Sequence, residues 1–199
     1  TTQEVANFLT TRTISYKLVT GSNAITFQEN LRKEAQSTNF AGIIAIGGDG
    51  LMHMVLQVAV ACNLPVATIP AGTGNDFVRT LGWNPEKPLE PLWAALNSDA
   101  TQIDLGTVDG EYFGAIASTG FDSVVNERAN RMKWPKGPAK YNVAMALELP
   151  KFQPLLYKFV IDGKRYEREA MLIAAGNGSS YGGGMLVCPN ADLNDGLLR

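Results

Sequence analysis

The sequence is poor in the residues that build disulfide-linked and zinc-stabilised domains. It has 199 residues but only two cysteines, Cys62 and Cys188, and a single histidine, His53. The cysteines form no CxxC pair and have no neighbouring histidine, so neither a disulfide framework nor a structural zinc site is supported. A reducing compartment, the cytoplasm, is the expected location.

The sequence also lacks a strong charge of either sign and any long apolar run. Its formal net charge is −2 and its pI is about 5.4, so we expect no nucleic-acid partner. No apolar stretch approaches the ~18 residues of a membrane-spanning helix, and no signal peptide opens the chain. Any contact with a bilayer is therefore expected to be peripheral and made by a local patch of residues.

The first half of the chain alternates short apolar strands with helices. Residues 41–46 and 65–70 predict buried strands, and residues 13–20 predict a further strand. Helices are predicted over residues 1–10, 24–36, 51–62 and from the loop after the second buried strand to about Leu81. This order is typical of an α/β domain whose parallel sheet is covered on both faces.

From about residue 100 the pattern becomes mostly antiparallel β. Strands are predicted over residues 103–108, 112–118, 155–161 and 166–175, with a helical interruption at 122–149. Asp-Gly pairs at 109–110 and 162–163 stand at hairpin positions.

We therefore predict two domains, residues 1–98 and 99–199. The three prolines within residues 83–91 mark the start of the connection between them. The sequence lacks an initiator Met and stops at Arg199, where a strand is expected to begin. The second domain is accordingly expected to be truncated.

A glycine-rich loop follows the first buried strand and reads Gly47, Gly48, Asp49, Gly50. Glycines let the backbone approach a ligand closely because no Cβ intervenes. The N–H groups and positive dipole end of the following helix suit phosphate. Asp49 repels phosphate by itself, so its presence is explained if it holds Mg²⁺, directly or through water. The alternative is an ordinary tight strand–helix turn.

A second such loop follows the next buried strand and contains Gly72, Thr73, Gly74, Asn75 and Asp76. It offers a hydroxyl, an amide and a second carboxylate. Loops on neighbouring parallel strands meet at the carboxyl edge of the sheet, where ligands bind. The alternative is simple helix capping by Thr73 or Asn75. Two glycine–acid loops in succession favour a joint phosphate site.

The combination of these loops resembles the diacylglycerol kinase catalytic family, which also includes sphingosine, ceramide and bacterial lipid kinases. The resemblance covers most of the chain and rests on residues 47–50, 70–77, 81–82, 104–106, 118–122 and 189–198. The first loop alone is shared with NAD kinases and phosphofructokinases, and the second gives the specificity. The resemblance implies an ATP-binding domain of that fold and a β-rich domain that receives the lipid.

The resemblance also implies roles for individual residues. Asp49 and Asp76 are predicted to be catalytic, organising metal and water at the phosphates. The predicted nucleotide contacts are Thr20, which closes the strand preceding the loops, and the loop residues Gly47, Gly48, Asp49, Gly50, Gly72, Thr73, Gly74 and Asn75.

A structural Mg²⁺ is implied near the end of the sequence. Asp195 would supply a carboxylate, and Asp192 and Leu197 would supply backbone oxygens. Asp104 is similar to an acidic residue that the family ties to an Asp–water–Mg²⁺ network.

The chain departs from the family after its first loop. A threonine, an asparagine and a glutamate are usual there, but this chain has Leu51, His53 and Met54, which weakens a metal site on that helix. We interpret His53 as a polar helix residue beside Gln57, with a phosphate or substrate contact as the alternative. The family's general base is an aspartate beyond Arg199, so no residue here takes that role by resemblance.

Two further segments carry hypotheses. Residues 176–184 contain five glycines in nine residues, which indicates either close approach of a ligand or a flexible hairpin. A basic stretch with little acidic compensation surrounds Met132 and Trp134 and suits an anionic bilayer, a solvated loop being the alternative. Its cations are Arg128, Arg131, Lys133, Lys136 and Lys140.

The sequence therefore predicts a lipid kinase that transfers the γ-phosphoryl group of ATP, with Mg²⁺, to the hydroxyl of diacylglycerol or a related lipid at the membrane surface. One alternative is an NAD kinase-like enzyme with a soluble acceptor. Another is a non-catalytic nucleotide-binding protein of the same fold. The sequence leaves open the lipid, the general base and the oligomeric state, a homodimer included.

Overall fold

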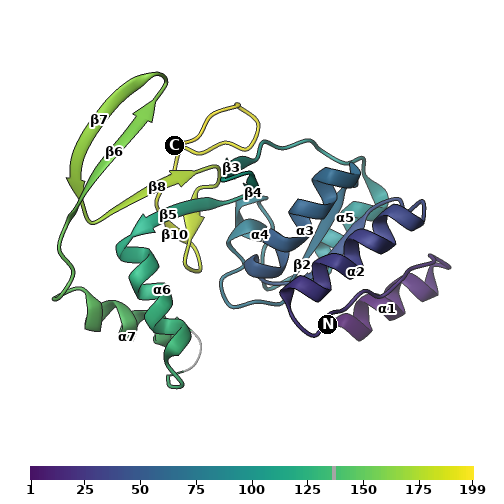
Figure 1. Ribbon diagram of the computed structural model, residues 1–199. Coiled ribbons are helices and arrows are strands. Elements are labelled where there is room, and N and C mark those ends of the chain that lie inside the picture. Colours follow the sequence, from purple (N-terminus) through teal and green to yellow (C-terminus); the bar gives the residue numbers. More distant parts are fainter. Residues whose placement is uncertain (136–137) are drawn as a thin grey trace. The chain divides into compact units, whose positions relative to one another are not determined.

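The computed structural model describes residues 1–135 and 138–199, which form two compact units (Figure 1). The first unit comprises Thr1–Ala115 and Gly176–Arg199, and the second comprises Ile116–Ala175. The glycine-rich residues 176–184 therefore belong to the same unit as the two predicted phosphate loops. The predicted domain boundary, between residues 98 and 99, does not coincide with the limits of these compact units. The division into two domains at that point stays a prediction.

The first unit contains helices and strands in succession, and its last regular elements form a short hairpin that a loop to Arg199 follows (Figure 1). Its elements are α1 (Thr2–Thr11), α2 (Ala24–Ser37), β1 (Ile43–Gly47), α3 (Asp49–Cys62), β2 (Val66–Pro70), α4 (Asp76–Thr80), α5 (Glu90–Asn97), β3 (Gly106–Val108), β4 (Glu111–Phe113), β9 (Ser180–Tyr181) and β10 (Met185–Leu186).

Strands β1 and β2 are parallel and end together. Their register runs from Ile43 opposite Val66 to Gly47 opposite Pro70. One more backbone hydrogen bond, from Ala71 N–H to the Gly47 carbonyl (3.0 Å), extends the pairing beyond the strand ends. The loops that leave the two strands therefore start side by side.

Helices cover both faces of this strand pair. On one face, Ala45 packs in a core with Leu31 of α2 and Val55 and Val58 of α3. On the other, Ile44 and Ile46 pack against a core of four buried residues from α1, β2 and α5, namely Val5, Leu9, Ile69 and Leu92. Alternate residues of β1 thus face opposite layers, as expected for a buried parallel strand.

The helix ends follow from local sequence signals. Asn23 precedes α2, and its side-chain oxygen accepts a hydrogen bond from Thr26 N–H (2.9 Å), a standard N-cap. Helix α3 begins after extended Gly48 and ends at Asn63, which adopts the left-handed conformation (φ 51°). The start of α3 at Asp49 places the glycine-rich loop in its first turn.

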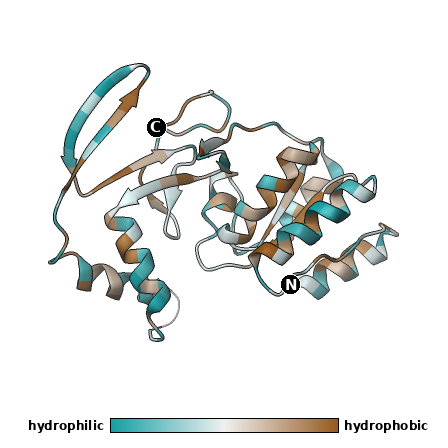
Figure 2. Cartoon of the chain, viewed as in Figure 1, coloured by the Kyte–Doolittle hydropathy of each residue, from teal (hydrophilic) through white to brown (hydrophobic). Residues whose placement is uncertain are grey.

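The described residues of the second unit form β5 (Ile116–Gly120), α6 (Phe121–Arg131), α7 (Pro138–Glu148), β6 (Leu155–Ile161), β7 (Lys164–Ala170) and β8 (Leu172–Gly176), whose last residue, Gly176, belongs to the first unit. Strand β5 pairs with β8. Helices α6 and α7 share a small core around Val125, Ala129 and Ala144. Strands β6 and β7 form an antiparallel hairpin whose turn residues Asp162 and Gly163 have φ of 49° and 78°, as a two-residue type I′ turn requires. Figure 2 shows β6 mainly hydrophobic and β7 mainly hydrophilic.

The predicted fold class, a parallel α/β half followed by a mostly antiparallel half, is confirmed. The strand predicted over residues 13–20 is wrong. In the described part of the chain no strand pairs with it, and Tyr16 and Leu18 stay largely exposed. The predicted strand 112–118 is interrupted at Gly114, where the ring of Phe77 lies 2.2 Å from the position a Cβ would take.

Candidate functional site

The two glycine loops form a single close-packed seam at the ends of β1 and β2. A Cβ built on Gly48 would lie 2.9 Å from the Gly72 Cα, and one built on Gly72 would lie 2.4 Å from the Gly48 Cα. Real Cβ atoms do not come this close to backbone, so both positions require glycine. The two loops meet at the edge of the sheet, as the sequence predicts.

The first loop presents unpaired N–H groups at the start of a 14-residue helix. The first bond of α3 is from Met52 N–H to the Gly48 carbonyl (3.1 Å), so the preceding N–H groups have no partner within the helix. Among the described residues, none pairs with the N–H of Asp49 or Gly50. A Cβ on Gly50 would meet nothing within 4 Å. Donors and open space together fit an anion at the positive end of the helix.

The second loop is held by its own asparagine. Asn75 Oδ1 accepts a hydrogen bond from Gly72 N–H (2.9 Å), and Asn75 Nδ2 donates to the Gly72 carbonyl (2.9 Å). Asn75 is 7% exposed and has φ of 53°, a conformation asparagine tolerates better than most residues. Its side chain therefore shapes the loop, in which Thr73 is exposed.

Asp49 connects the first loop to the helix after the second. Its Oδ1 accepts a hydrogen bond from Phe77 N–H (3.0 Å). Its Oδ2 would lie 2.9 Å from a Cβ on Gly74, and within residues 1–135 and 138–199 it has no hydrogen-bond partner. Asp49 thus keeps one carboxylate oxygen available beside the loop seam.

Asp76 uses both of its oxygens within the protein. Oδ1 accepts from Gly184 N–H (2.8 Å) and Oδ2 from Gly183 N–H (2.9 Å), and the residue is only 6% exposed. The carboxylate therefore fastens the β9–β10 hairpin to the second loop. The sequence does not indicate this contact, because 107 and 108 residues separate the partners. The predicted catalytic role of Asp76 stays a prediction.

Asp104 lies against the segment for which a magnesium site was predicted. Gly196 N–H donates to Asp104 Oδ2 (2.7 Å), and Asp104 N–H donates to the Leu193 carbonyl (2.6 Å). The buried Asn177 donates from Nδ2 to the carbonyls of Asp104 (2.8 Å) and Gly114 (3.0 Å). Asn177 was not among the predicted site residues. Its side chain connects Asp104 to Gly114, which follows β4.

The carboxylate of Asp195 is already satisfied. Its Oδ1 accepts from Leu197 N–H (3.0 Å), and its Oδ2 pairs with the Arg199 guanidinium. Asp192 Oδ1 accepts from Asn194 N–H (3.0 Å) in a local turn. The described residues contain no group of three or more acidic, histidine or cysteine side chains placed to hold a metal ion. Mg²⁺ at Asp195 Oδ2 would have to displace the Arg199 guanidinium. The predicted site, which combines this carboxylate with the backbone oxygens of Asp192 and Leu197, stays a prediction.

Thr20 and His53 have contacts that are separate from the two loops. Thr20 is exposed, and its carbonyl accepts from Asn30 Nδ2 (2.9 Å). His53 Nε2 lies 3.3 Å from Glu111 Oε2 on β4. Beside it, Gln57 exchanges two hydrogen bonds with the backbone of Tyr112 (2.8 and 2.9 Å). These contacts join α3 to β4 and support the interpretation of His53 as a structural polar residue.

Leu51 replaces the usual threonine with a packing contact. A Cβ on Gly47 would lie 2.5 Å from Leu51 Cδ2, and Leu51 packs against the α2–α3 core. The leucine therefore closes over the end of β1 and contributes no hydroxyl to the site.

The predicted lack of acidic compensation in the basic stretch is wrong for its arginines. Arg128 pairs with Glu148 of α7, and Arg131 pairs with Glu127 one helical turn earlier. Lys136 lies outside the described residues. No helix in the described part of the chain is both long and apolar enough to cross a bilayer. A membrane role for this stretch stays a prediction.

Two families match successive parts of the chain. Residues 1–108 match the family described as "Diacylglycerol kinase catalytic domain", and residues 115–199 match the "YegS C-terminal NAD kinase beta sandwich-like domain". Both glycine loops fall within the first match.

Curated relatives and solved structures agree with these matches. The chain is 43% identical over 162 residues to a diacylglycerol kinase of Mycobacterium tuberculosis, covering 78% of this chain and 52% of the relative. It is 35% identical over 169 residues to a diacylglycerol kinase of Bacillus subtilis, covering 83% and 56%. A crystal structure of a diacylglycerol kinase from Bacillus anthracis superposes with a TM-score of 0.67 at 26% identity, over 91% of this chain and 59% of that one. The chain spans about half the length of the curated relatives that it matches.

Proposed function

The chain belongs to the family of the diacylglycerol kinase catalytic domain, and from this premise we propose that it is a lipid kinase, which transfers the γ-phosphoryl group of ATP to a lipid hydroxyl. The resemblance predicted from the two loops is thereby confirmed at the level of the family. Diacylglycerol is the acceptor class favoured by the names of the relatives from Mycobacterium tuberculosis and Bacillus subtilis.

The observation that carries the proposal is the seam between Gly48 and Gly72. Their backbones approach so closely that neither position admits a Cβ, and the adjacent first turn of α3 has N–H groups without partners among the described residues. A polyphosphate needs this combination of donors, positive dipole end and absent side chains. An ordinary strand–helix turn does not need two neighbouring loops in contact.

The residues of the seam would act by positioning. The N–H groups at Asp49 and Gly50 would hold the nucleotide phosphates, and the braced loop between Gly72 and Asn75 would fix their orientation. Mg²⁺ bound with ATP supplies neutralisation of the charge that develops during phosphoryl transfer. Asp49 is the better placed of the two predicted catalytic aspartates, since one of its oxygens has no described hydrogen bond.

We propose further that the protein binds its lipid acceptor at the membrane surface. This follows from the acceptor class rather than from any patch, because the arginines of the basic stretch are paired with glutamates.

The test is transfer of label from γ-³²P-ATP, with Mg²⁺, into mixed micelles that contain a short-chain diacylglycerol. Label in the chloroform-soluble product, absent without lipid, is the expected result. A parallel reaction offers NAD as the acceptor, and equilibrium binding of ATP is measured on the same preparation.

The outcomes separate the proposal from its competitors. Transfer to NAD in preference to lipid would identify the soluble-acceptor kinase. Binding of ATP with no transfer to either acceptor would identify a non-catalytic nucleotide-binding protein. Failure to bind ATP would contradict the assignment of a phosphate site at the loop seam and, with it, the kinase proposal.

A further inference from the structure

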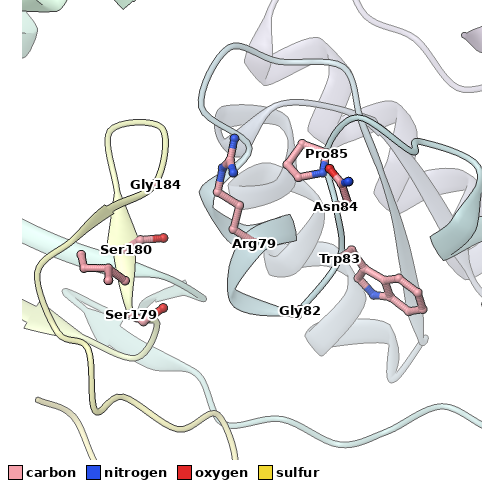
Figure 3. A pocket seen from close by; sticks show the side chains of 9 residues that line it. Arg79, Gly82, Trp83, Asn84, Pro85, Ser179, Ser180 and Gly184 are labelled. Atoms are coloured by element: carbon pink, nitrogen blue, oxygen red, sulfur yellow. The ribbon is translucent and has the colours of Figure 1, made fainter.

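An open pocket of about 430 Å³ adjoins the second loop, within the first compact unit. It lies between α4, the segment that follows α4, and the β9–β10 hairpin. Figure 3 shows the Arg79 side chain between the hairpin, which carries Ser179 and Ser180, and the segment that carries Asn84 and Pro85. None of these lining residues is among those predicted for the nucleotide.

Two local features build the pocket walls. Gly82 has φ of 80°, and Trp83 N–H donates back to the Val78 carbonyl (3.1 Å), so the chain reverses at the end of α4. On the opposite side, the carboxylate of Asp76 fixes the hairpin through Gly183 and Gly184. One wall is therefore held by a backbone hydrogen bond and the other by a carboxylate that does not line the pocket.

Several donor groups of the pocket side chains have no partner among the described residues. Arg79 makes no ion pair with any described carboxylate, and its one hydrogen bond, from Nε to the Gly74 carbonyl, is long (3.4 Å). Asn84 uses Oδ1 to accept from Glu86 N–H (2.9 Å), which leaves its NH₂ donors unused among the described residues. The hydroxyls of Ser179 and Ser180 have no hydrogen-bond partner within residues 1–135 and 138–199, although Ser180 is only 3% exposed.

The pocket is thus positively charged on one side. Asp76, the acid on the same helix as Arg79, directs both oxygens to hairpin amides. A guanidinium with flanking amide and hydroxyl donors matches the oxygens of a phosphate ester, which it can bind through two parallel hydrogen bonds.

The remaining lining is apolar. Trp83, Pro85 and Leu186 contribute to the wall, and Leu186 is 68% exposed. A free inorganic anion has no apolar atoms to contact these side chains. An amphiphilic lipid would place its glycerol and first methylene groups against them.

We propose that this pocket binds the phosphate group of a phosphate-bearing lipid, with Arg79 as the charge partner and Leu186 against the chain that follows the headgroup. The inference rests on the proposed function for its choice of a lipid, and names a phosphomonoester, the group that lipid kinases produce, as the ligand. Arg79 is a binding residue here, and it is separate from the N–H groups at the start of α3 that are proposed above to hold the nucleotide phosphates.

The test is calorimetric titration of the chain without ATP, using inorganic phosphate, glycerol 3-phosphate, dihexanoyl phosphatidic acid and dihexanoylglycerol. Phosphatidic acid should bind more tightly than glycerol 3-phosphate, and the neutral dihexanoylglycerol should bind most weakly. Arg79→Gln should weaken phosphatidic acid binding by about tenfold or more, since a hydrogen bond to a charged group is lost. Arg165→Gln, an exposed arginine of β7 outside the pocket, should leave the affinity unchanged.

Two more variants keep the test decisive if Arg79→Gln fails to fold, which circular dichroism would show. Asn84→Asp replaces the donor NH₂ with an oxygen but retains the acceptor for Glu86 N–H, and should weaken both phosphate esters. Leu186→Ser should weaken phosphatidic acid but not glycerol 3-phosphate.

Equal affinities for the Arg79→Gln and Arg165→Gln proteins would overturn the proposal, as would displacement of phosphatidic acid by ATP. If inorganic phosphate bound as tightly as phosphatidic acid, the pocket would be a phosphate site without preference for a lipid, and the proposal of a lipid ligand would be overturned. Because no turnover is measured, these results stand whether or not the chain transfers phosphate, and the kinase proposal can fail without them.

Discussion

Glycines serve two different purposes in the loop seam and in the β9–β10 hairpin. At Gly48 and Gly72 the φ angle is not positive, but a Cβ would lie 2.9 or 2.4 Å from the other backbone. At Gly183 a Cβ would meet nothing within 4 Å, but φ is 91°. The seam therefore needs glycine for approach, and the hairpin needs it for conformation.

The difference separates binding geometry from support. Two backbones in contact expose N–H groups that no side chain can cover, which is what a phosphate requires. A positive φ only reverses the chain, and asparagine supplies it elsewhere, at Asn63 and Asn75. The two regions are joined by Asp76, whose carboxylate lies in the second loop and accepts from the hairpin.

The largest effect is expected from Gly72→Ala, which should break the seam. The new Cβ would meet the Gly48 Cα at 2.4 Å, and backbone cannot move away as a side chain can. We expect a loss of about 3 kcal/mol in the free energy of unfolding, at the upper end for overpacking. Urea denaturation measures it, and ATP binding should be lost even under conditions where the variant is folded.

Gly50→Ala is the matched control within the same site. A Cβ there has open space, and alanine in the first turn of α3 should leave stability equal or raise it by up to about 1 kcal/mol. Similar destabilisation by both substitutions would mean that the close approach of the loops is not what glycine provides at Gly72.

Asp49→Asn should lower phosphoryl transfer by about a hundredfold, the cost of removing one preorganised charge from a transfer site. Stability should change little, because the amide oxygen can still accept from Phe77 N–H. Initial rates with γ-³²P-ATP, together with urea denaturation of the same variant, measure the two effects. Near-normal turnover would remove Asp49 from the chemistry.

The sequence predicts the seam well because its signals are local. The strands at 43–47 and 66–70 and the glycines that follow them are contiguous in the chain, and the geometry of parallel strands brings their ends together. The hairpins at Asp109-Gly110 and Asp162-Gly163 are predicted for the same reason, since the turn residues specify them.

Contacts between distant segments are not predictable from such signals. The motif around Asp76 predicts a catalytic acid. Only the folded chain shows that its carboxylate accepts hydrogen bonds from Gly183 and Gly184 N–H. The strand expected at 13–20 has the right alternation but lacks a paired neighbour in the described chain. Pairing of the arginines in the basic stretch depended on a helix that places Glu127 one turn before Arg131.

Asp76→Asn tests the link between the two regions. The amide oxygen can keep one of the two hairpin hydrogen bonds, but its NH₂ faces the other N–H donor, so about 2 kcal/mol of unfolding free energy should be lost. Amide hydrogen exchange at Gly183 and Gly184 should accelerate. Asp109→Asn, in an exposed turn with φ of 50°, is the control and should be neutral, since asparagine suits that conformation. Equal effects of the two variants would argue against a clamp.

The smallest effect is expected from Gly183→Ala, because only the conformation of one residue opposes it. The new Cβ meets no atom within 4 Å, so no packing is disturbed, and the positive φ should lower the free energy of unfolding by about 1 kcal/mol. Gly163→Ala in the β6–β7 turn has the same open surroundings and a φ of 78°, and urea denaturation should give it a matching loss. ATP binding should persist in both proteins, since neither touches the seam. A loss as large as that of Gly72→Ala would show that the hairpin glycine is also a site of close approach, and the distinction between the two regions would no longer hold.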